Sequence, residues 1–143
     1  MLGAVRASPT DGPSHRLRGG DGDRPTVDVT DDTFIRCPPT AVAPAIADPS
    51  AWAGWWPGLV LAVSRDRGAK GVQWLVAGRL TGTMEIWLEP VSTGTVLHWF
   101  LRADPPVRPS SRGSARLRDR EVRAWKRHAF ALKDRLEGAE RVT

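Results

Sequence analysis

The chain has 143 residues and a formal net charge of +5, a length that suits one domain with a single core. Its only cysteine, Cys37, excludes an intramolecular disulfide bond and is typical of a reducing compartment. Arg6 interrupts the N-terminal apolar residues before a signal peptide could form. No apolar run approaches the roughly 20 residues of a membrane span. We therefore expect a soluble, cytoplasmic protein without stable membrane insertion.

Residues 1–26 are rich in glycine, proline and charged residues and have almost no apolar periodicity. A segment of this composition cannot bury enough apolar surface to offset the entropy lost on ordering. We expect a disordered tail over residues 1–26, a folded domain over residues 27–138 and a frayed C-terminus over residues 139–143.

A strand and a short helix open the folded part of the chain. Residues 27–37 predict a strand, which Pro38 and Pro39 must end because proline removes a backbone donor. Thr40 then stands where an N-cap residue would, and predicts a helix over residues 41–47.

A second short helix follows directly. Asp48 suits the N-cap and Pro49 the first helical position, where a missing N–H costs nothing. Trp52, Trp55 and Trp56 then recur at i, i+3 and i+4, so they should gather on one side of two helical turns.

Four further strands are separated by glycine- and proline-containing turns, and their alternation predicts an antiparallel meander over residues 59–65, 72–77, 83–89 and 95–102. If Glu89 faces Gly94 across the last turn, Met84 lies opposite Trp99 and Glu85 opposite His98. Because side chains alternate between faces, one face is then apolar and comprises Val72, Trp74, Val76, Met84, Ile86, Leu88, Leu97 and Trp99.

A long amphipathic helix closes the chain. Ser111 or Ser114 is placed to cap its start, and Gly138 stands where a C-terminal glycine cap would. Its apolar side chains recur at spacings of three and four and form one stripe: Val122, Trp125, Ala129, Leu132 and Leu136. A meander with a matching apolar face and one large helix to cover it predicts an α+β domain that holds something between sheet and helix.

This order of elements is that of the helix-grip fold, and the chain resembles the START-like superfamily, which includes polyketide cyclases, aromatase/cyclases and lipid-transfer proteins. The carriers are DPSAW at residues 48–52, WWP at 55–57, GTMEIWLEP at 82–90 and EVRAWKRH at 121–128. Together they are similar to a small actinobacterial branch described as polyketide cyclase-like. The resemblance implies a START-like helix-grip domain with the antiparallel sheet wrapped on the C-terminal helix. It leaves the activity open, since one fold serves catalysts, carriers and sensors.

Two interpretations of the tryptophans follow from these patterns. As a binding protein, the chain would hold a small hydrophobic or aromatic ligand, polyketide-like or lipid-like, between sheet and helix. The contacts would be Trp74, Met84, Ile86, Leu97, Trp99 and Trp125, with no cofactor. Alternatively these large side chains fill the core. We favour ligand contact for Trp99 and Trp125, and core packing for Trp52, Trp55 and Trp56.

The alternative to a binding protein is a polyketide aromatase/cyclase. Glu85 and His98, as cross-strand neighbours, could remove and return protons beside a carbonyl, and Arg102 could hold an anionic or carbonyl group. The competing explanation is an ordinary charged pair on the solvent face. The predicted register favours this second explanation, because it places Glu85 and His98 opposite the helix-facing side.

Other chemistry has little support in the sequence. His15, His98 and His128 are far apart, and none has a cysteine at ligand spacing, so we expect no metal site. Cys37, beside two prolines, is typical of an inert thiol at a strand end. Basic residues are not interleaved with exposed stacking aromatics, which argues against nucleic-acid binding.

A third possibility is a ligand-free protein that binds a partner through its basic C-terminal helix. Residues 102–143 hold twelve basic and six acidic residues, a net charge of +6. An acidic protein or anionic membrane surface could dock there, although acidic residues interrupt this surface and an ordinary solvated face is the simpler explanation. The sequence does not determine the oligomeric state.

Overall fold

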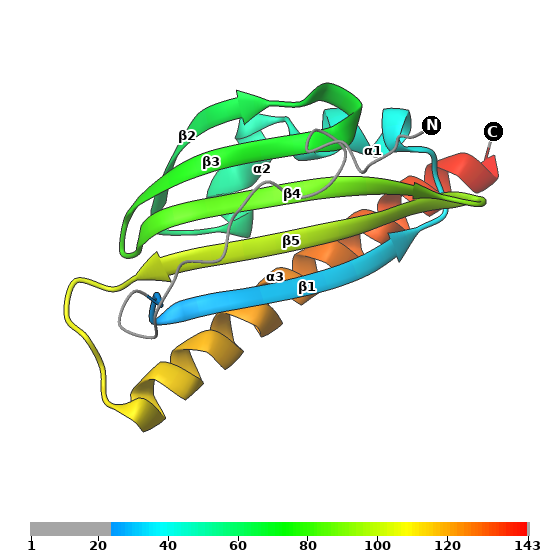
Figure 1. The fold of residues 1–143 in the computed structure, drawn as a ribbon. Coiled ribbons are helices and arrows are strands. Elements are labelled where there is room, and N and C mark those ends of the chain that lie inside the picture. The colour runs from blue at the N-terminus through cyan, green and yellow to red at the C-terminus, as the bar shows by residue number, and fades with distance from the viewer. Residues whose placement is uncertain (1–23, 143) are drawn as a thin grey trace, which may run out of the picture.

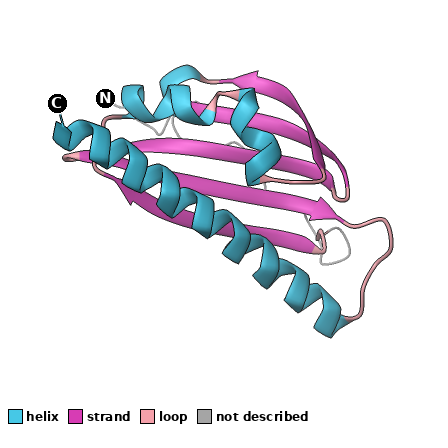
Figure 2. Cartoon of the chain, turned by 180° about the vertical axis from the view of Figure 1, so that it is seen from behind, coloured by secondary structure: helices cyan, strands magenta, loops and turns pink. Residues whose placement is uncertain are grey.

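The computed structural model describes residues 24–142, with the side chains of residues 140–142 left out. One antiparallel sheet carries all the helices on a single face (Figures 1 and 2). The elements in chain order are β1 (Val27–Ile35), α1 (Pro39–Ile46), α2 (Pro49–Trp55), β2 (Leu59–Asp66), the 3₁₀ turn η2 (Gly68–Lys70), β3 (Gly71–Gly78), β4 (Thr81–Val91), β5 (Gly94–Asp104) and α3 (Ser111–Val142).

The five strands lie in the order β1-β5-β4-β3-β2, and every neighbouring pair is antiparallel. The predicted register is wrong by two residues: Val91, not Glu89, faces Gly94, so Met84 pairs with Leu101 and Ile86 with Trp99. The turn is tighter than expected because β4 continues through Pro90. A shift of two residues leaves every side chain on its predicted face, since faces alternate with a period of two.

The apolar face of the sheet and the apolar stripe of α3 meet as predicted. The eight side chains predicted for this face are all buried. On α3, Trp125, Ala129 and Leu132 are fully buried, and Val122 and Leu136 are partly buried against the same core. The α+β class predicted from the sequence is therefore confirmed. We call the face that carries the helices the inner face, and the opposite one the outer face.

The helix starts agree with the sequence in one case and differ in two. The α2 start is as predicted, because Asp48 accepts a hydrogen bond from the Ser50 N–H at 3.0 Å. Hydrogen bonds from Ser50 also lower the pKa of Asp48. Helix α1 begins earlier than expected, with Pro38 rather than Thr40 at the N-cap. Pro39 can start the helix without losing a bond.

Helix α3 also differs at both ends from the prediction. Neither Ser111 nor Ser114 caps it, because the Ser110 hydroxyl accepts from the Gly113 N–H at 3.0 Å. Gly138 does not end it, since the helix continues to Val142. A glycine inside a helix weakens it modestly but does not stop it.

Hydrogen bonds join α3 to the edge strand β1 and to the residue that follows this strand. Lys126 Nζ donates to the Asp32 carbonyl at 2.7 Å, and Lys133 Nζ donates to the Phe34 carbonyl at 2.8 Å. Glu137 accepts from the Arg36 N–H at 2.8 Å. These hydrogen bonds fix the position of α3 along β1. They thereby also fix the position of Trp125 against the sheet.

The predicted tail falls mostly on residues 1–23, which lie outside the described part of the chain. Thr26, at its end, donates its backbone N–H to Asp104 Oδ1 at 2.8 Å and so joins the first and last strands. Within residues 24–142, no helix combines the length and apolar character needed to cross a membrane.

Candidate functional site

The six predicted ligand contacts come together on the inner face. Each is at most 2% exposed, and they come from β3, β4, β5 and α3: Trp74, Met84, Ile86, Leu97, Trp99 and Trp125. Strand alternation brings the first five to one surface, and the α3 stripe adds the sixth.

The tryptophan rings contact one another directly. Trp125 stacks on Trp99 with ring centroids 5.6 Å apart, and on Trp56 at 5.3 Å. Trp56 also meets Trp74 edge to face at 5.4 Å. We call Trp56, Trp74, Trp99 and Trp125 the tryptophan cluster. Trp56 was expected to pack in the core, and it does so at 2% exposure, in contact with rings from both the sheet and α3.

The tryptophan cluster has an unusual hydrogen-bond deficit. The indole Nε1 atoms of all four members are buried, and no acceptor in the described part of the chain lies within reach. By contrast, Trp52 Nε1 donates to the Ile46 carbonyl at 3.0 Å. A buried donor without an acceptor costs about 1–3 kcal/mol, and most native indole N–H groups avoid this. The cluster therefore offers four donors that an acceptor-bearing molecule could satisfy.

Helix α2 covers the cluster with half-buried side chains. It contains no fully buried residue, yet its Trp52 and Trp55 touch the rings of Trp74 and Trp125 at 5.3 and 5.7 Å. Trp56 follows directly as its C-cap residue. A movement of α2 would therefore carry Trp56 with it and open the space between Trp74 and Trp125.

Arg79, in the turn between β3 and β4, holds the end of α2 against α3. Its Nε donates to the Pro57 carbonyl at 2.7 Å, and its two terminal nitrogens donate to Glu121 at 2.5 and 3.3 Å. The Glu121 side chain is only 6% exposed and lies one helical turn before Trp125. Gly58 has φ +82° and packs against the Arg79 side chain, so the turn that ends α2 requires a glycine there. Arg79 acts as a latch across the cluster.

The three predicted catalytic residues lie on the outer face. Glu85 is opposite Phe100 and His98 is opposite Trp87, so Glu85 and His98 are not the direct neighbours that the predicted register made them. Glu85 accepts hydrogen bonds from Arg67 at 3.4 Å and from Gln73 at 3.2 Å. Arg102 lies 3.6 Å from Asp28.

His98 has both ring nitrogens engaged by carboxylates. Nδ1 lies 2.7 Å from Asp32 Oδ1 and Nε2 lies 2.8 Å from Glu89 Oε1, while the ring stacks on Trp87 at 4.5 Å. The sheet separates this group from the tryptophan cluster. The cyclase alternative needed Glu85 and His98 to point into the space between sheet and helix, whereas strand alternation turns them to the opposite face, as the predicted register favoured.

Cys37 and His128 form no further chemical site within residues 24–142, and His15 lies outside the described part of the chain. The Cys37 thiol is buried and lies 3.6 Å from the Leu136 carbonyl. Two causes lower the pKa of His128. Burial is the larger cause, and repulsion from the positive charge of Arg127 is the smaller one. In the described part of the chain, no three His, Cys, Asp or Glu side chains are grouped to hold a metal ion.

The chain matches no family model and no curated protein. Its fold is similar to that of the Aha1 dimer from Colwellia psychrerythraea, solved in solution, with a TM-score of 0.56 and 17% identity over 78% of this chain and 96% of that chain. Protein CV1439 from Chromobacterium violaceum gives a TM-score of 0.55 and 19% identity over 78% and 98% of the two chains. For TTHA0849 from Thermus thermophilus the values are 0.52 and 13%, over 78% and 98%.

At these identities the likeness concerns the fold alone. A five-stranded antiparallel sheet closed by one long C-terminal helix, together with these neighbours, is an α+β helix-grip fold. The predicted fold is confirmed. The ligand and activity must be argued from the site.

Proposed function

We propose that the protein binds a small hydrophobic or aromatic molecule, polyketide-like or lipid-like, between the sheet and α3. The observation that carries this proposal is the set of four buried indole N–H groups without acceptors in the tryptophan cluster. A fold built to fill its own core would rarely leave four such donors together. The fold class, in which a helix grips the sheet, is consistent with a ligand in this place.

The tryptophan cluster also indicates which chemical groups the ligand must carry. Indole N–H groups donate and cannot accept, so the ligand needs oxygen acceptors such as ketones, ethers or a carboxylate. The remaining contacts, Met84, Ile86 and Leu97, are apolar. A flat ring bearing carbonyl oxygens would stack on the face of one indole and accept hydrogen bonds from the in-plane N–H groups of neighbouring indoles. A polyketide-derived aromatic molecule has both features.

Access to the site would involve α2. Release of the Arg79–Glu121 latch would let α2 and Trp56 move away from Trp74 and Trp125. The ligand would then take the place of the Trp56 ring. Because the outer-face residues Glu85, His98 and Arg102 cannot reach this space, the proposal is a binding role rather than cyclase chemistry.

The remaining parts of the proposal concern family and location. We place the chain in the polyketide cyclase-like actinobacterial branch on the strength of the motifs at residues 82–90 and 121–128. A single cysteine that lies buried supports a cytoplasmic setting. The oligomeric state is left open.

The test uses two probes of the same shape, flavone and 2-phenylnaphthalene, of which only flavone carries oxygen acceptors. Quenching of tryptophan fluorescence in the full-length protein gives the dissociation constants. We expect flavone to bind at least about tenfold more tightly, because each satisfied donor contributes about 0.5–1.5 kcal/mol. Native mass spectrometry of protein purified from its own host should show one bound small molecule.

Tryptophan-to-phenylalanine variants supply the control. Trp99→Phe and Trp125→Phe keep an aromatic ring but remove the N–H, so the preference for flavone should shrink. Trp52→Phe removes an N–H that already has an acceptor, and the preference should stay. Equal affinity for the two probes in the wild-type protein, or a preference unchanged in all three variants, would contradict the proposal.

A further inference from the structure

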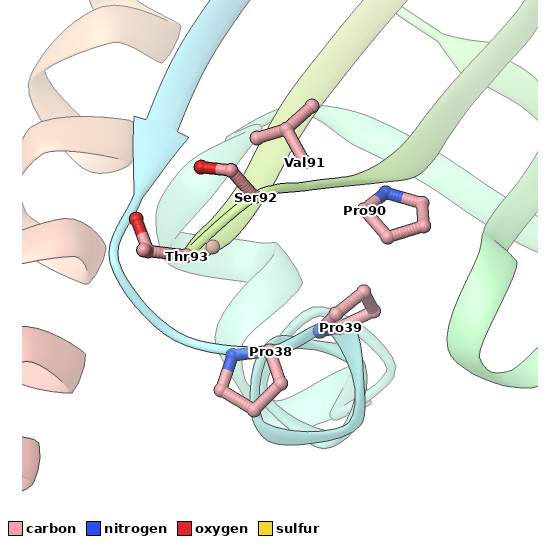
Figure 3. Close-up of a pocket in the computed structure, with 7 residues that line it drawn as sticks. Pro38, Pro39, Pro90, Val91, Ser92 and Thr93 are labelled. Atoms are coloured by element: carbon pink, nitrogen blue, oxygen red, sulfur yellow. The ribbon is translucent and has the colours of Figure 1, made fainter.

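The rings of the tryptophan cluster are closed off from solvent, since each is at most 2% exposed. Two surface hollows beside Pro38, Pro39 and Pro90 lie at the opposite end of β4 from Arg79, and Figure 3 shows the prolines of one of them. None of the cluster's rings is among their lining residues. A molecule that enters the cluster therefore needs part of the chain to move.

A short segment that begins and ends with glycine covers the cluster. It reads GWWPG at residues 54–58 and includes Trp56, which the sheet and α3 do not supply. Gly58 has φ +82°, a conformation that favours glycine. We call residues 54–58 the flap.

Gly54, at the other end of the flap, has no packing reason to be glycine. Its φ is not positive, and a Cβ atom added there would meet nothing within 4 Å. Glycine weakens a helix relative to alanine because it has more backbone freedom to lose. The same freedom is what a hinge requires, so Gly54 suits a segment that moves.

The two sides of Gly54 are anchored in different ways. On the N-terminal side, Trp52 Nε1 donates to the carbonyl of the fully buried Ile46 at the end of α1, at 3.0 Å. On the other side, Trp55 is half-buried, and Trp56 contacts the cluster through its ring alone, at 5.3 and 5.4 Å. Gly54 thus separates a fixed part of α2 from a part that ring contacts hold.

Arg79 supplies the polar contacts of the flap. Its backbone N–H donates to the Gly58 carbonyl at 3.1 Å, and its Nε donates to the Pro57 carbonyl at 2.7 Å. The buried Glu121 carboxylate holds the guanidinium in place. We infer that the flap turns about Gly54 and Gly58, is held closed by Arg79, and opens to admit the ligand to the tryptophan cluster. Its role as the entrance rests on the proposed function.

The indole N–H of Trp56 reports flap opening without any ligand. It is buried and has no acceptor in the described part of the chain, so its exchange with water depends on access. NMR of the full-length protein after transfer to D2O measures this exchange, and Trp56→Phe identifies the signal. We expect little dependence on low urea concentrations, because a local opening exposes little surface. Exchange of the β5 backbone amides through global unfolding should rise steeply with urea.

Two variants should change this exchange in opposite directions. Arg79→Gln removes the bond to Pro57 and should make exchange of the Trp56 indole at least about tenfold faster. Gly54→Ala stiffens the hinge and should make it about twofold to fivefold slower. Glu137→Gln is the control, because its contact with the Arg36 N–H lies outside the flap. It should speed exchange of the β5 amides and leave the Trp56 indole unchanged.

Stopped-flow mixing with flavone tests the flap as the entrance. The association rate constant should rise in Arg79→Gln and fall in Gly54→Ala by the same factors as the indole exchange. Both rates are proportional to the population of the open form. An association rate constant that stays the same while the exchange changes would overturn the entrance role.

Two results would overturn the flap itself. The first is a Trp56 indole that exchanges with the same urea dependence as the β5 amides. The second is an exchange rate that neither variant changes. If Arg79→Gln does not fold, Gly54→Ala decides, because it leaves every bond of Arg79 in place. Flavone that fails to bind would contradict the proposed function, whereas the exchange measurements need no ligand, so the two failures can be told apart.

Discussion

At the scale of single residues, Trp125 joins α3 both to the sheet and to the residue that follows α2. It is 1% exposed and stacks on both Trp56 and Trp99. Loss of a fully buried large aromatic removes both transfer free energy and packing contacts. The whole stability of a domain of this size is about 5–15 kcal/mol, so this one residue contributes a large share.

We expect Trp125→Ala to lower the free energy of unfolding by roughly 3–5 kcal/mol. Urea denaturation followed by circular dichroism measures this change. Trp55→Ala is the matched control, because Trp55 lies half-buried on α2 and touches Trp125 only at the ring edge. A smaller loss is expected there. Equal losses for the two variants, or no loss for Trp125→Ala, would show that α3 is not packed through Trp125.

Single residues also show what the sequence could and could not reveal about the site. Alternation along the strands assigned Trp74 and Trp99 to the inner face, and the helical period added Trp125. The same patterns say nothing about where an indole N–H points, so the missing acceptors could not be foreseen. Trp56 was expected in the core and lies there, but its contacts with both Trp74 and Trp125 could not be predicted, because its position depends on the irregular turn after α2.

At the scale of elements, sequence patterns predicted which face of the sheet each side chain occupies, but not the register between neighbouring strands. The predicted pairs of β4 and β5 were displaced by two residues, because the turn between these strands is shorter than expected. Each side chain nevertheless lies on its predicted face, because the face depends only on whether the position is odd or even. The predicted cross-strand neighbour of each side chain was wrong. His98 therefore stacks on Trp87 instead of standing beside Glu85.

The contact between α3 and the end of β1 predicts a pH dependence. Two hydrogen bonds lower the pKa of Glu137 below its ordinary 4.5. The bond from Lys133 has the larger effect, and the bond from the Arg36 N–H has the smaller one. The unfolded chain then binds the proton more readily than the folded one. The extra stability is therefore fully present above about pH 4.5 and is lost as the pH falls through the lower pKa of the folded state.

Glu137→Gln tests this contact. We expect the variant to be less stable than the wild type at pH 7, and the difference to shrink as the pH falls below about 4.5. Urea denaturation at several pH values between about 7 and 3 gives the comparison. Asp134→Asn removes one negative charge from the exposed side of α3 and should show a smaller difference. A Glu137→Gln difference that is constant with pH would mean that the charge of Glu137 does not stabilise the α3–β1 contact.

At the scale of the whole molecule, the sheet divides two environments of different chemistry. The inner face gathers apolar side chains and indole donors, while the outer face carries His98 between two carboxylates and stacked on Trp87. The order of elements in the sequence predicted the fold, because the apolar stripes of sheet and helix are local patterns.

The outer surface of α3 leads to the last prediction. Arg116, Arg120, Arg123 and Arg127 are exposed and lie along one side of the helix, opposite Trp125, although Asp119 pairs with Arg123 at 3.0 Å. We expect the protein to sediment with phosphatidylserine vesicles at low salt and to lose this binding by about 0.5 M salt, since exposed charges are then screened within a few ångströms. The double variant Arg116→Glu/Arg120→Glu should abolish the binding, and Arg65→Glu on β2 should have much less effect. Sedimentation that persists in high salt, or that both variants weaken alike, would rule out α3 as an electrostatic docking surface.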